Sequence, residues 1–388
     1  MEQFIPYSRQ NITEEDIEAV NKVLKSDLIT SGPVVPLFEK SVSEKLQAQY
    51  SIATNSATSA LHIACLSIGL KEGEALWTSP ITFVASSNCG LYCGAKIDFI
   101  DINISTGLID INNLEKKLKV AEKEGNLPKV IIPVHLAGAS CDMKKIKCLS
   151  ERYGFYIIED ASHAFGGKYN DFYVGGCQYS DITVFSFHPV KIITAGEGGL
   201  ATTNNPELAQ KMRDLRTHGI VKETSRLNTL NPSPWQYEQQ SLGFNYRMSD
   251  INAALVLNQF KRVDEIVDLR NQKLRNYILL IKDMPVKFLD IAENVKSSVH
   301  LGVISFEDIS EKKHREIFSS LRQRNIGVQL HYSPVHLQPF YRKMGFYKGQ
   351  FPASERYSSS SLSLPLFPEL TFSMQENIVN CLKYLINN

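Results

Sequence analysis

Several signatures of common nucleotide and metal sites are missing from this chain. It holds neither a GxGxxG nor a GxxxxGK[ST] segment, and it has no HExxH and no paired CxxC. Those patterns are typical of dinucleotide sites, P-loops, zinc proteases and structural zinc sites. A nicotinamide-dependent enzyme is therefore excluded as far as motifs allow, and no metal is expected. Any phosphate ligand must be held by other local chemistry.

Cysteine pairing and long apolar runs are lacking as well. The seven cysteines are odd in number, and the closest pair, Cys89 and Cys93, lacks the two-residue gap of a redox or zinc motif. No stretch approaches the roughly 20 apolar residues of a membrane helix. The opening residues, MEQFIPYSRQ, show no apolar core of signal-peptide length. We therefore expect a reduced, cytoplasmic protein with no membrane contact.

Charge of one sign is not in excess. The chain has 42 basic and 41 acidic residues, a formal net charge of +1. No chain-wide field would draw it to nucleic acid or anionic lipid. Its 388 residues, 43% hydrophobic and 21% charged, are those of an ordinary globular protein with a large core. Two domains are expected.

Short apolar runs alternate with helical patterns over the first half of the chain. A capping box at Thr13 and apolar residues at helical spacing predict a helix over about 14–25. Strands are predicted at 51–54, 75–78, 96–100, 129–134, 155–158 and 182–187. The segments between the first five fit helices, notably 58–68 and 111–123. This alternation implies the α/β class, with a largely parallel sheet covered on both faces.

The second half follows another pattern. A helix is expected over about 207–216, and the polar segment 219–243 is typical of a long functional loop. One long helix is predicted from about 249 to 282. Beyond it we expect a strand at 299–306, a helix at 313–324, a strand at 327–330 and a final helix at 374–386, with the serine run 358–361 on a polar helix face. A large domain is therefore placed at 1–250, and a bridging helix with a small α+β domain at 251–388.

Two predicted strands lead into reactive side chains. The strand at 155–158 runs into Glu159, Asp160 and His163, and the carboxyl ends of strands are where ligands bind in doubly wound folds. Asp160 would equally serve as a cap of the next turn. The strand at 182–187 leads to Lys191 and to three glycines within 196–199. A lysine is usually a solvated charge, but one shielded in a pocket can lose its proton and act as a Schiff-base nucleophile.

Two further segments suit a flat, phosphorylated ligand. Ser56, Ala57 and Thr58 stand where a strand passes into a helix, whose free N–H groups form a phosphate seat or an ordinary N-cap. Phe83 follows another strand, where it would stack on a ring or join the core.

Together the four segments predict pyridoxal phosphate (PLP) as the cofactor. Lys191 would carry it as a Schiff base and move the substrate proton, and Asp160 would keep the pyridine nitrogen protonated. Phe83 would stack on one face of the ring, and His163 would support the other face or the ring substituents. The amides of Ala57 and Thr58, with the Ser186 hydroxyl, would bind the phosphate.

The same segments resemble the DegT/DnrJ/EryC1/StrS family of sugar aminotransferases. The motifs include Asn55-Ser-Ala-Thr-Ser-Ala-Leu61, Ser79-Pro-Ile-Thr-Phe-Val-Ala85, Glu159-Asp-Ala-Ser-His-Ala164 and Gly243-Phe-Asn-Tyr-Arg-Met-Ser-Asp250, and the resemblance covers essentially the whole chain. It implies a fold-type I (aspartate aminotransferase-like) architecture. It also implies a homodimer with shared active sites, because in relatives the residue matching Asn245 reaches the partner's PLP phosphate.

Within that family the chain is most similar to the PseC-type aminotransferases of the pseudaminic acid pathway. The supporting segments are 134–138, 141–143, 186–191 and 331–339. This resemblance implies that glutamate gives its amino group to C4 of a UDP-linked 4-keto-6-deoxy-N-acetylhexosamine of the L-altro series. By analogy, the nucleotide sugar would contact Tyr7, Asp27, Leu28, Ile29, Thr30, Gln329, Leu330, His331 and Tyr332.

Three other functions remain to be weighed. Some relatives carry histidine in place of the lysine and dehydrate sugars, and Lys191 argues against that activity. An aminotransferase for another nucleotide sugar, a D-series 4-keto or a 3-keto sugar, would differ in pocket shape. A PLP-binding regulator would bind the cofactor without turnover.

Overall fold

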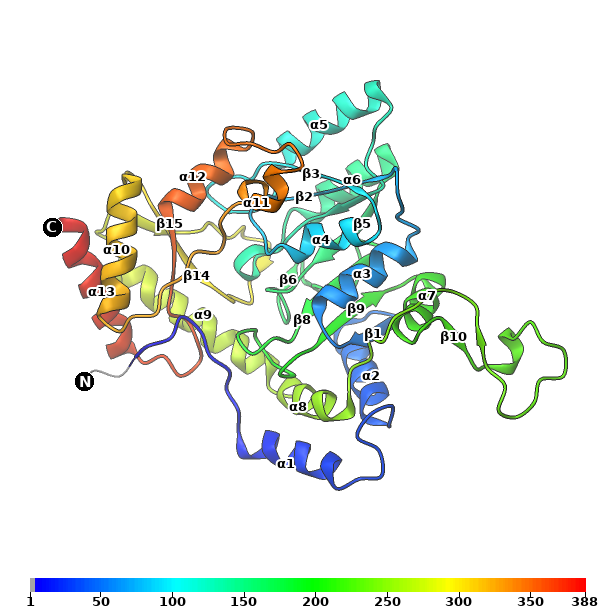
Figure 1. Ribbon diagram of the computed structural model, residues 1–388. Helices are drawn as coiled ribbons and strands as arrows, with labels where there is room; N and C mark the ends of the chain where they lie inside the picture. Colours follow the sequence, from blue (N-terminus) through cyan, green and yellow to red (C-terminus); the bar gives the residue numbers. More distant parts are fainter. Residues whose placement is uncertain (1–3) are drawn as a thin grey trace.

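The computed structural model describes residues 4–388. A seven-stranded sheet lies at the centre of the folded molecule (Figure 1). In spatial order its strands are β1 (Tyr50–Thr54), β9 (Gly199–Thr203), β8 (Ile182–Ser186), β5 (Tyr156–Asp160), β4 (Val130–Ile132), β2 (Ala75–Thr78) and β3 (Lys96–Phe99). Strands β8, β5, β4, β2 and β3 are parallel, whereas β9 is antiparallel to β1 and β8. The predicted strands of this sheet are confirmed, and β9 is a strand that the sequence patterns missed.

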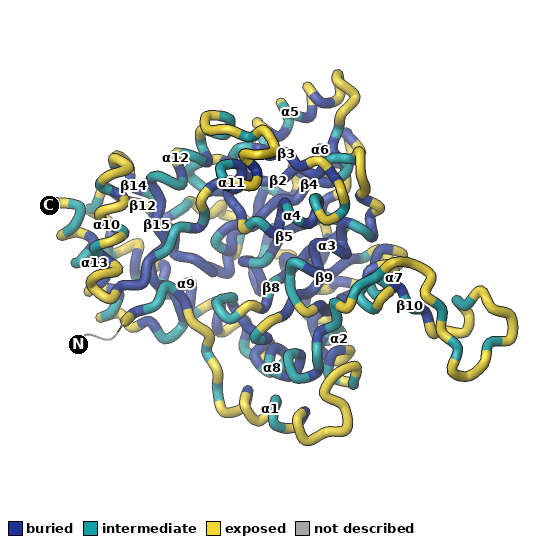
Figure 2. Tube along the Cα trace, in the orientation of Figure 1, coloured by how far each residue is buried: buried dark blue, intermediate teal, exposed yellow. Residues whose placement is uncertain are grey.

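Alternate residues of the strands face two different cores, because successive side chains of a strand point to opposite faces. Ile132 and Ile158 share one core with α3 (Ala57–Ser67), α4 (Ala85–Tyr92) and α7 (Pro206–Arg216). Ile131 and Ile157 face the other, with α5 (Ile111–Glu124) and α6 (Met143–Tyr153). The sheet is accordingly the buried centre of the molecule (Figure 2). The helices predicted at 58–68, 111–123 and 207–216 are confirmed to within one residue at each end.

The N-terminal helices lie at the β1 end of the sheet. The predicted first helix is present as α1 (Glu14–Leu24), with a capping box between Thr13 and Asp16. After it, α2 (Val34–Leu46) buries Phe38 in a third core that includes Ala53 of β1 and Leu200 of β9.

The prediction of a single helix over 249–282 is wrong. The structure has α8 (Asp250–Phe260) and α9 (Val263–Leu280), separated at Lys261 and Arg262. At the break these two N–H groups bond to carbonyls three residues back, as in a tighter 3₁₀ turn. Arg262 has φ −112°, and its guanidinium lies 2.7 Å from the Asp16 carboxylate of α1. Helical periodicity could not show this break, because the residue that Arg262 binds there lies 246 positions earlier.

A smaller antiparallel sheet, of order β12-β14-β15, lies in the C-terminal part. It consists of β12 (Val286–Phe288), β14 (Gly302–Phe306) and β15 (Ser361–Leu364), with helices α10 (Glu311–Gln323), α11 (Pro339–Arg342), α12 (Pro352–Ser360) and α13 (Phe372–Asn387). The prediction of a strand at 327–330 is wrong, because this segment forms only a single bridge, between Gln329 and Ser363. The third strand is instead β15, so the serine run is divided between α12 and a buried strand.

The long loop expected over 219–243 projects from the body of the molecule (Figure 1, right). Its base is closed by β10 (Ile220–Val221) and β11 (Glu238–Gln239), with the 3₁₀ turn η2 (Thr224–Arg226) between them. The side chains of Leu230 and Trp235 are 91% and 81% exposed. Other short elements are β6 (Lys168–Tyr169), β7 (Phe172–Tyr173), β13 (Val295–Lys296), η1 (Leu136–Gly138) and η3 (Val335–Leu337).

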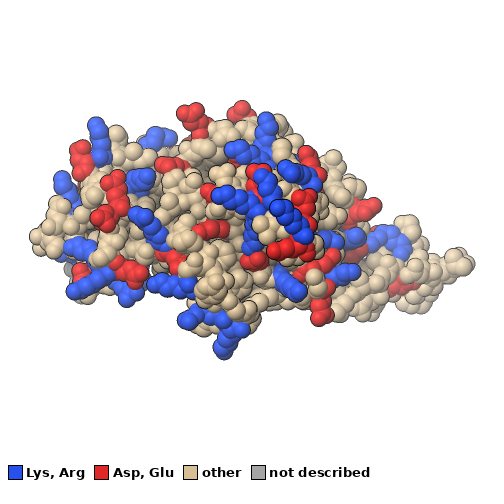
Figure 3. All heavy atoms as spheres, turned by 90° about the horizontal axis from the view of Figure 1, so that it is seen from above, with Lys and Arg blue, Asp and Glu red and all other residues tan. Residues whose placement is uncertain are grey.

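The start of the described chain lies against the C-terminal core. Ile5 forms a bridge with Ile326 and is buried in the core of the smaller sheet. The division at residue 250 stays a prediction. No helix within residues 4–388 is both long and apolar enough to cross a membrane. Acidic and basic side chains are interspersed over the face shown in Figure 3, in keeping with the balanced charge.

Candidate active site

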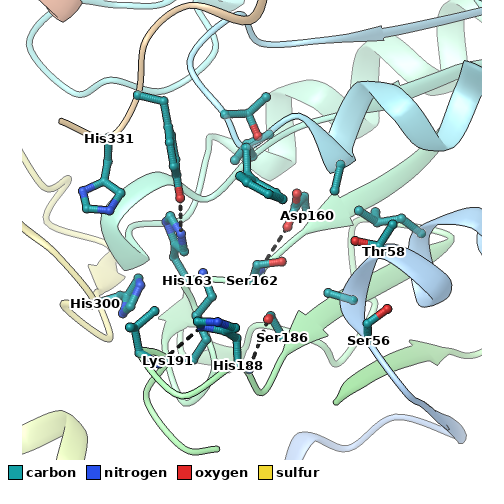
Figure 4. Close-up of a pocket in the computed structure, with 18 of the residues that line it drawn as sticks. Ser56, Thr58, Asp160, Ser162, His163, Ser186, His188, Lys191, His300 and His331 are labelled. Atoms are coloured by element: carbon teal, nitrogen blue, oxygen red, sulfur yellow. Dashed lines mark hydrogen bonds between the residues drawn. The ribbon is translucent and has the colours of Figure 1, made fainter. Parts of the chain in front are cut away.

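A cavity of about 410 Å³ opens beside the carboxyl ends of β5 and β8. Its lining includes Tyr7, Ser56, Ala57, Thr58, Thr82, Phe83, Asp160, Ser162, His163, Ser186, His188, Lys191, Glu197, His300, His331 and Tyr332 (Figure 4). Ligands of open α/β sheets bind at this edge. The structure therefore gathers segments that are far apart in the sequence at the place where the fold favours a ligand.

Lys191 lies on the loop that follows β8, and its side chain reaches the cavity (Figure 4). Burial lowers the pKa of the Lys191 amine from 10.5 to about 8, although the charge of Asp160 acts in the opposite direction. The N-terminal segment passes close by, since Ser8 Oγ donates a hydrogen bond to the Val190 carbonyl at 3.1 Å. A buried amine with this pKa is available as a nucleophile and base near neutral pH.

Asp160 is the last residue of β5 and is 5% exposed. Its Oδ2 accepts a hydrogen bond from Ser86 Oγ at 2.6 Å, and its Oδ1 accepts one from the Ser162 amide at 3.1 Å. The neighbouring Glu159 does not line the cavity; it binds His135 Nε2 at 2.6 Å. Strand alternation thus assigns the two adjacent carboxylates to different tasks, and only Asp160 is offered to a ligand.

One side of the cavity, which we call the hydroxyl wall, consists of Ser56, Ala57, Thr58 and Ser186. Ser56 is the N-cap of α3 and accepts a hydrogen bond from the Ser59 amide at 3.2 Å. The first amides of α3 lie at the helix N-terminus, where they have no partner within the helix. This end of the helix therefore favours an anion. Gly199 is needed here, since a Cβ on it would stand 2.4 Å from the Ser56 carbonyl group.

The opposite side, which we call the imidazole wall, consists of His163, His300, His331 and Tyr332. Burial lowers the pKa of His163 and of His300 well below the usual range and that of His331 to about 3, and Lys191 adds to each effect. All three rings are therefore neutral at physiological pH. His300 Nδ1 is buried and has no hydrogen-bond partner among the described residues.

The hydrogen bonds of His163 fix its tautomer. The Ala137 amide donates to Nδ1 at 3.3 Å, so the proton of this neutral ring is on Nε2. Nε2 in turn lies 3.1 Å from the Tyr332 hydroxyl and donates to it. The Tyr332 hydroxyl hydrogen is then free to point toward a ligand. Burial raises the pKa of Tyr332, which keeps the hydroxyl in its donor form.

The residues present fit PLP. The cavity offers a buried amine for the aldehyde and a carboxylate for the pyridine nitrogen. It also offers a helix N-terminus with hydroxyl groups for the phosphate, and the 59% exposed ring of Phe83 for the flat ring of the cofactor. His163 lies on the same cavity as expected. Ser186 and the Ala57–Thr58 turn also lie there. The assignment of individual roles to these residues stays a prediction.

Some predicted contacts do not line this cavity in the described chain. Asn245 is exposed and bridges to Thr217. Asp27, Leu28, Ile29 and Thr30 are exposed residues of the connection after α1. Gln329 and Leu330 line a separate hollow beside α10 and α12, whereas the adjacent His331 and Tyr332 line the cavity.

The sequence patterns missed Ser86, Ser162 and His300. Ser162 stands two residues after Asp160, so a search for amide donors next to that carboxylate would have found it. Ser86 lies 74 positions earlier, and nothing in the sequence separates it from Ser87. His300 has no such local signal. It reaches the cavity because its amide bonds to the Ala137 carbonyl at 2.8 Å, a contact between distant segments.

Comparisons with known proteins agree with this geometry. The model of the DegT/DnrJ/EryC1/StrS aminotransferase family matches residues 10–383. The UDP-4-amino-4,6-dideoxy-N-acetyl-beta-L-altrosamine transaminase of Campylobacter jejuni (strain 81-176) is 38% identical over 368 residues, 94% of this chain and 93% of the relative. The spore coat polysaccharide biosynthesis protein SpsC of Bacillus subtilis is 33% identical over 390 residues, 99% of this chain and 97% of the relative.

Solved structures are similar over nearly the whole chain. Helicobacter pylori PseC, described as an aminotransferase involved in the biosynthesis of pseudoaminic acid, has a TM-score of 0.91 and 30% identity, with 99% of this chain and 100% of that chain covered. The putative sugar aminotransferase Spr1654 from Streptococcus pneumoniae in its PLP form has a TM-score of 0.89 and 27% identity, with 99% of each chain covered. The fold-type I class and the PLP cofactor expected from the sequence are confirmed.

Proposed function

Because this chain belongs to the DegT/DnrJ/EryC1/StrS aminotransferase family and is a PLP-dependent sugar aminotransferase, we propose its substrates. It transfers an amino group from glutamate to C4 of a UDP-linked 4-keto-6-deoxy-N-acetylhexosamine of the L-altro series. The product would enter pseudaminic acid biosynthesis. The observation that carries the choice of sugar is the 38% identity, over 94% of the chain, to a transaminase named for that sugar.

The cofactor is held by residues of both walls. Asp160 would accept a hydrogen bond from the pyridine nitrogen, Phe83 and His163 would flank the ring, and the start of α3 with Ser186 would bind the phosphate. When bound, PLP supplies an electron sink for the negative charge that develops at the substrate carbon losing its proton. The neutral imidazoles add no positive charge that would compete with that sink.

Lys191 holds and moves the substrate proton. Its pKa of about 8 leaves a useful fraction of free amine near neutral pH, while the protonated form remains accessible for return of the proton. Burial in the cavity keeps bulk water away from this exchange. Tyr332, fixed by His163, offers a hydroxyl hydrogen to an oxygen of the sugar.

The nucleotide part of the substrate extends beyond the cavity. Tyr7 lies at the cavity, with its ring 5.3 Å from that of His331. We assign sugar or nucleotide contacts to Tyr7 and to the segments 27–30 and 329–332. We also propose a homodimer in which Asn245, exposed in the single chain, binds the PLP phosphate of the second copy.

The test is a direct assay of purified protein with PLP and glutamate. UDP-linked 4-keto-6-deoxy-N-acetylhexosamines of the L-altro series and of the D series are supplied separately, and products are followed by mass spectrometry and NMR. We expect a 4-amino product from the L-altro sugar, and none from Lys191→Ala protein. Turnover of only a D-series or 3-keto sugar would replace the proposed substrate. Cofactor binding without turnover of any keto sugar would indicate a regulator.

A further inference from the structure

A buried chain of hydroxyl groups leads from the cavity rim to Asp160. Ser86, in the first turn of α4, is fully buried and lies 2.6 Å from Asp160 Oδ2. Thr82, which lines the cavity, lies 2.6 Å from the same Ser86 oxygen. Neither Ser86 nor Thr82 belongs to the set of cofactor-binding residues assigned above.

The direction of these hydrogen bonds follows from the chemistry of the carboxylate. An ionised carboxylate only accepts, so Ser86 donates its hydrogen to Asp160. The short bond between Thr82 and Ser86 must then have Thr82 as the donor. The alternative acceptor for Ser86, the Phe83 carbonyl, is farther away at 3.3 Å. The relay therefore runs from Thr82 through Ser86 to Asp160.

This arrangement holds the carboxylate in one orientation. Oδ2 accepts from Ser86 and Oδ1 accepts from the Ser162 amide, so rotation of the carboxylate would break both bonds. Each oxygen still has a lone pair for a ligand donor. Hydrogen bonds to charged groups are also stronger than those between neutral groups.

The same relay links two parts of the cofactor site. Thr82 immediately precedes Phe83, the exposed ring at the cavity, and Ser86 lies one turn later. The segment that carries the stacking ring is thereby tied to the carboxylate that meets the ring nitrogen. A change at Ser86 would disturb the position of Asp160 first and that of Phe83 second.

We propose that Ser86 is a positioning residue that acts through Asp160, fixing the carboxylate for the pyridine nitrogen of PLP. This inference rests on the assignment of PLP to the cavity and is independent of which sugar is the substrate. Its test therefore uses cofactor binding and the reaction with the amino donor alone.

The neighbouring Ser87 provides a matched control. It has the same side chain, lies in the same helix and is fully buried, but its hydroxyl lies 2.6 Å from that of Tyr341 and does not reach Asp160. Ser86→Ala and Ser87→Ala each remove one buried hydroxyl from α4. Their effects on the melting temperature of the apoprotein should be similar, so that a difference in cofactor properties reports on Asp160.

The experiment measures the PLP dissociation constant of apoprotein and the pH dependence of the visible absorbance of the bound cofactor. It also measures the rate of the half-reaction with glutamate. For Ser86→Ala we expect PLP binding about tenfold weaker, a shifted pH profile and a half-reaction about tenfold slower, as for a lost hydrogen bond to a charged group. For Ser87→Ala we expect all three to stay within about twofold of wild type.

A double-mutant cycle decides whether Ser86 acts through Asp160. In an Asp160→Asn background, Ser86→Ala should weaken PLP binding little further, because the group that it positions has been changed. Thr82→Val, which keeps Ser86, should give a smaller loss in the same direction and serves if Ser86→Ala does not fold.

The proposal would be overturned if the losses in PLP affinity from Ser86→Ala and Asp160→Asn multiplied in the double mutant, because the two residues would then act independently. Equal cofactor losses in Ser86→Ala and Ser87→Ala would do the same. So would a Ser86→Ala or Thr82→Val protein that binds PLP as wild type does. Failure of the wild-type protein to bind PLP would remove the cofactor assignment as well, whereas failure to use the L-altro sugar would leave this inference intact.

Discussion

The two walls of the cavity differ in how the chain builds them. The hydroxyl wall comes from two strand ends, where β1 passes into α3 and where β8 ends at Ser186. The imidazole wall draws on three segments, one after β5 and two from the C-terminal part of the chain. Its backbone is held by hydrogen bonds from distant side chains: Ser298 Oγ donates to the His163 carbonyl at 2.7 Å, and Arg270 donates to the His300 carbonyl at 3.2 Å.

The walls also differ in electrical character. The hydroxyl wall presents amides at a helix N-terminus, which favour a fixed anion such as a phosphate. The imidazole wall is kept neutral by burial and by Lys191, so it suits an uncharged, polar ligand. We propose a division of labour in which the hydroxyl wall holds the phosphate of the cofactor, while His300, His331 and Tyr332 of the imidazole wall face the substrate.

The largest expected effect is at Lys191, which lies between the walls. Lys191→Ala removes the amine that we propose binds the cofactor and carries the proton, so transamination should fall by roughly four orders of magnitude or more. The visible absorbance of the Schiff base between Lys191 and PLP should be lost. Spectrophotometry and product analysis measure both. A variant that kept the colour and the rate would mean that another group holds the cofactor.

Tyr332→Phe tests the imidazole wall. It removes the hydroxyl that His163 orients but keeps the ring, so turnover of the keto sugar should fall about tenfold, the usual scale for one lost hydrogen bond. PLP retention and the glutamate half-reaction should be nearly unchanged.

Ser186→Ala tests the hydroxyl wall and should show the opposite pattern, with several-fold weaker PLP retention and little change in turnover at saturating PLP. Identical patterns in the two variants would end the distinction between the walls.

A smaller effect concerns the pH at which Lys191 becomes reactive. Since burial lowers its pKa from 10.5 to about 8, the amine is protonated below about pH 8 and free above it. The rate at which apoprotein captures PLP should rise with pH through a midpoint near 8. Asp160→Asn removes the charge that raises the Lys191 pKa and should move the midpoint lower. A midpoint near 10.5 would contradict the burial of this amine, and an upward shift in Asp160→Asn would contradict the effect of the Asp160 charge on it.

Local patterns predicted the elements whose residue types and spacing are distinctive by themselves. The capping box of α1, the helices α3, α5 and α7 and the parallel strands follow from spacing and apolar content. The predictions failed where distant contacts decide the backbone. The expected long helix is interrupted at Arg262, which binds Asp16, and the third strand of the small sheet is β15, which pairs with β14, in place of 327–330.

The candidate site shows the same division. Lys191, Asp160, Phe83, Ser186 and the Ala57–Thr58 turn could be predicted because each stands at the end of a recognisable strand. Which of Glu159 and Asp160 faces the cavity follows from strand alternation together with the position of His135 in the fold. Ser86 could not be singled out from Ser87 by sequence, since only the packing of α4 turns one hydroxyl to Asp160 and the other to Tyr341.

The sequence by itself determined the alternating strands and helices, the reactive lysine, the carboxylate and the family. These depend on residue type and short-range spacing, which the chain carries directly. The tertiary structure alone decided which imidazoles surround Lys191, how far burial lowers the pKa of its amine, and which hydroxyl holds Asp160. Burial and hydrogen-bond direction depend on atoms brought together from distant segments, and no local pattern records them.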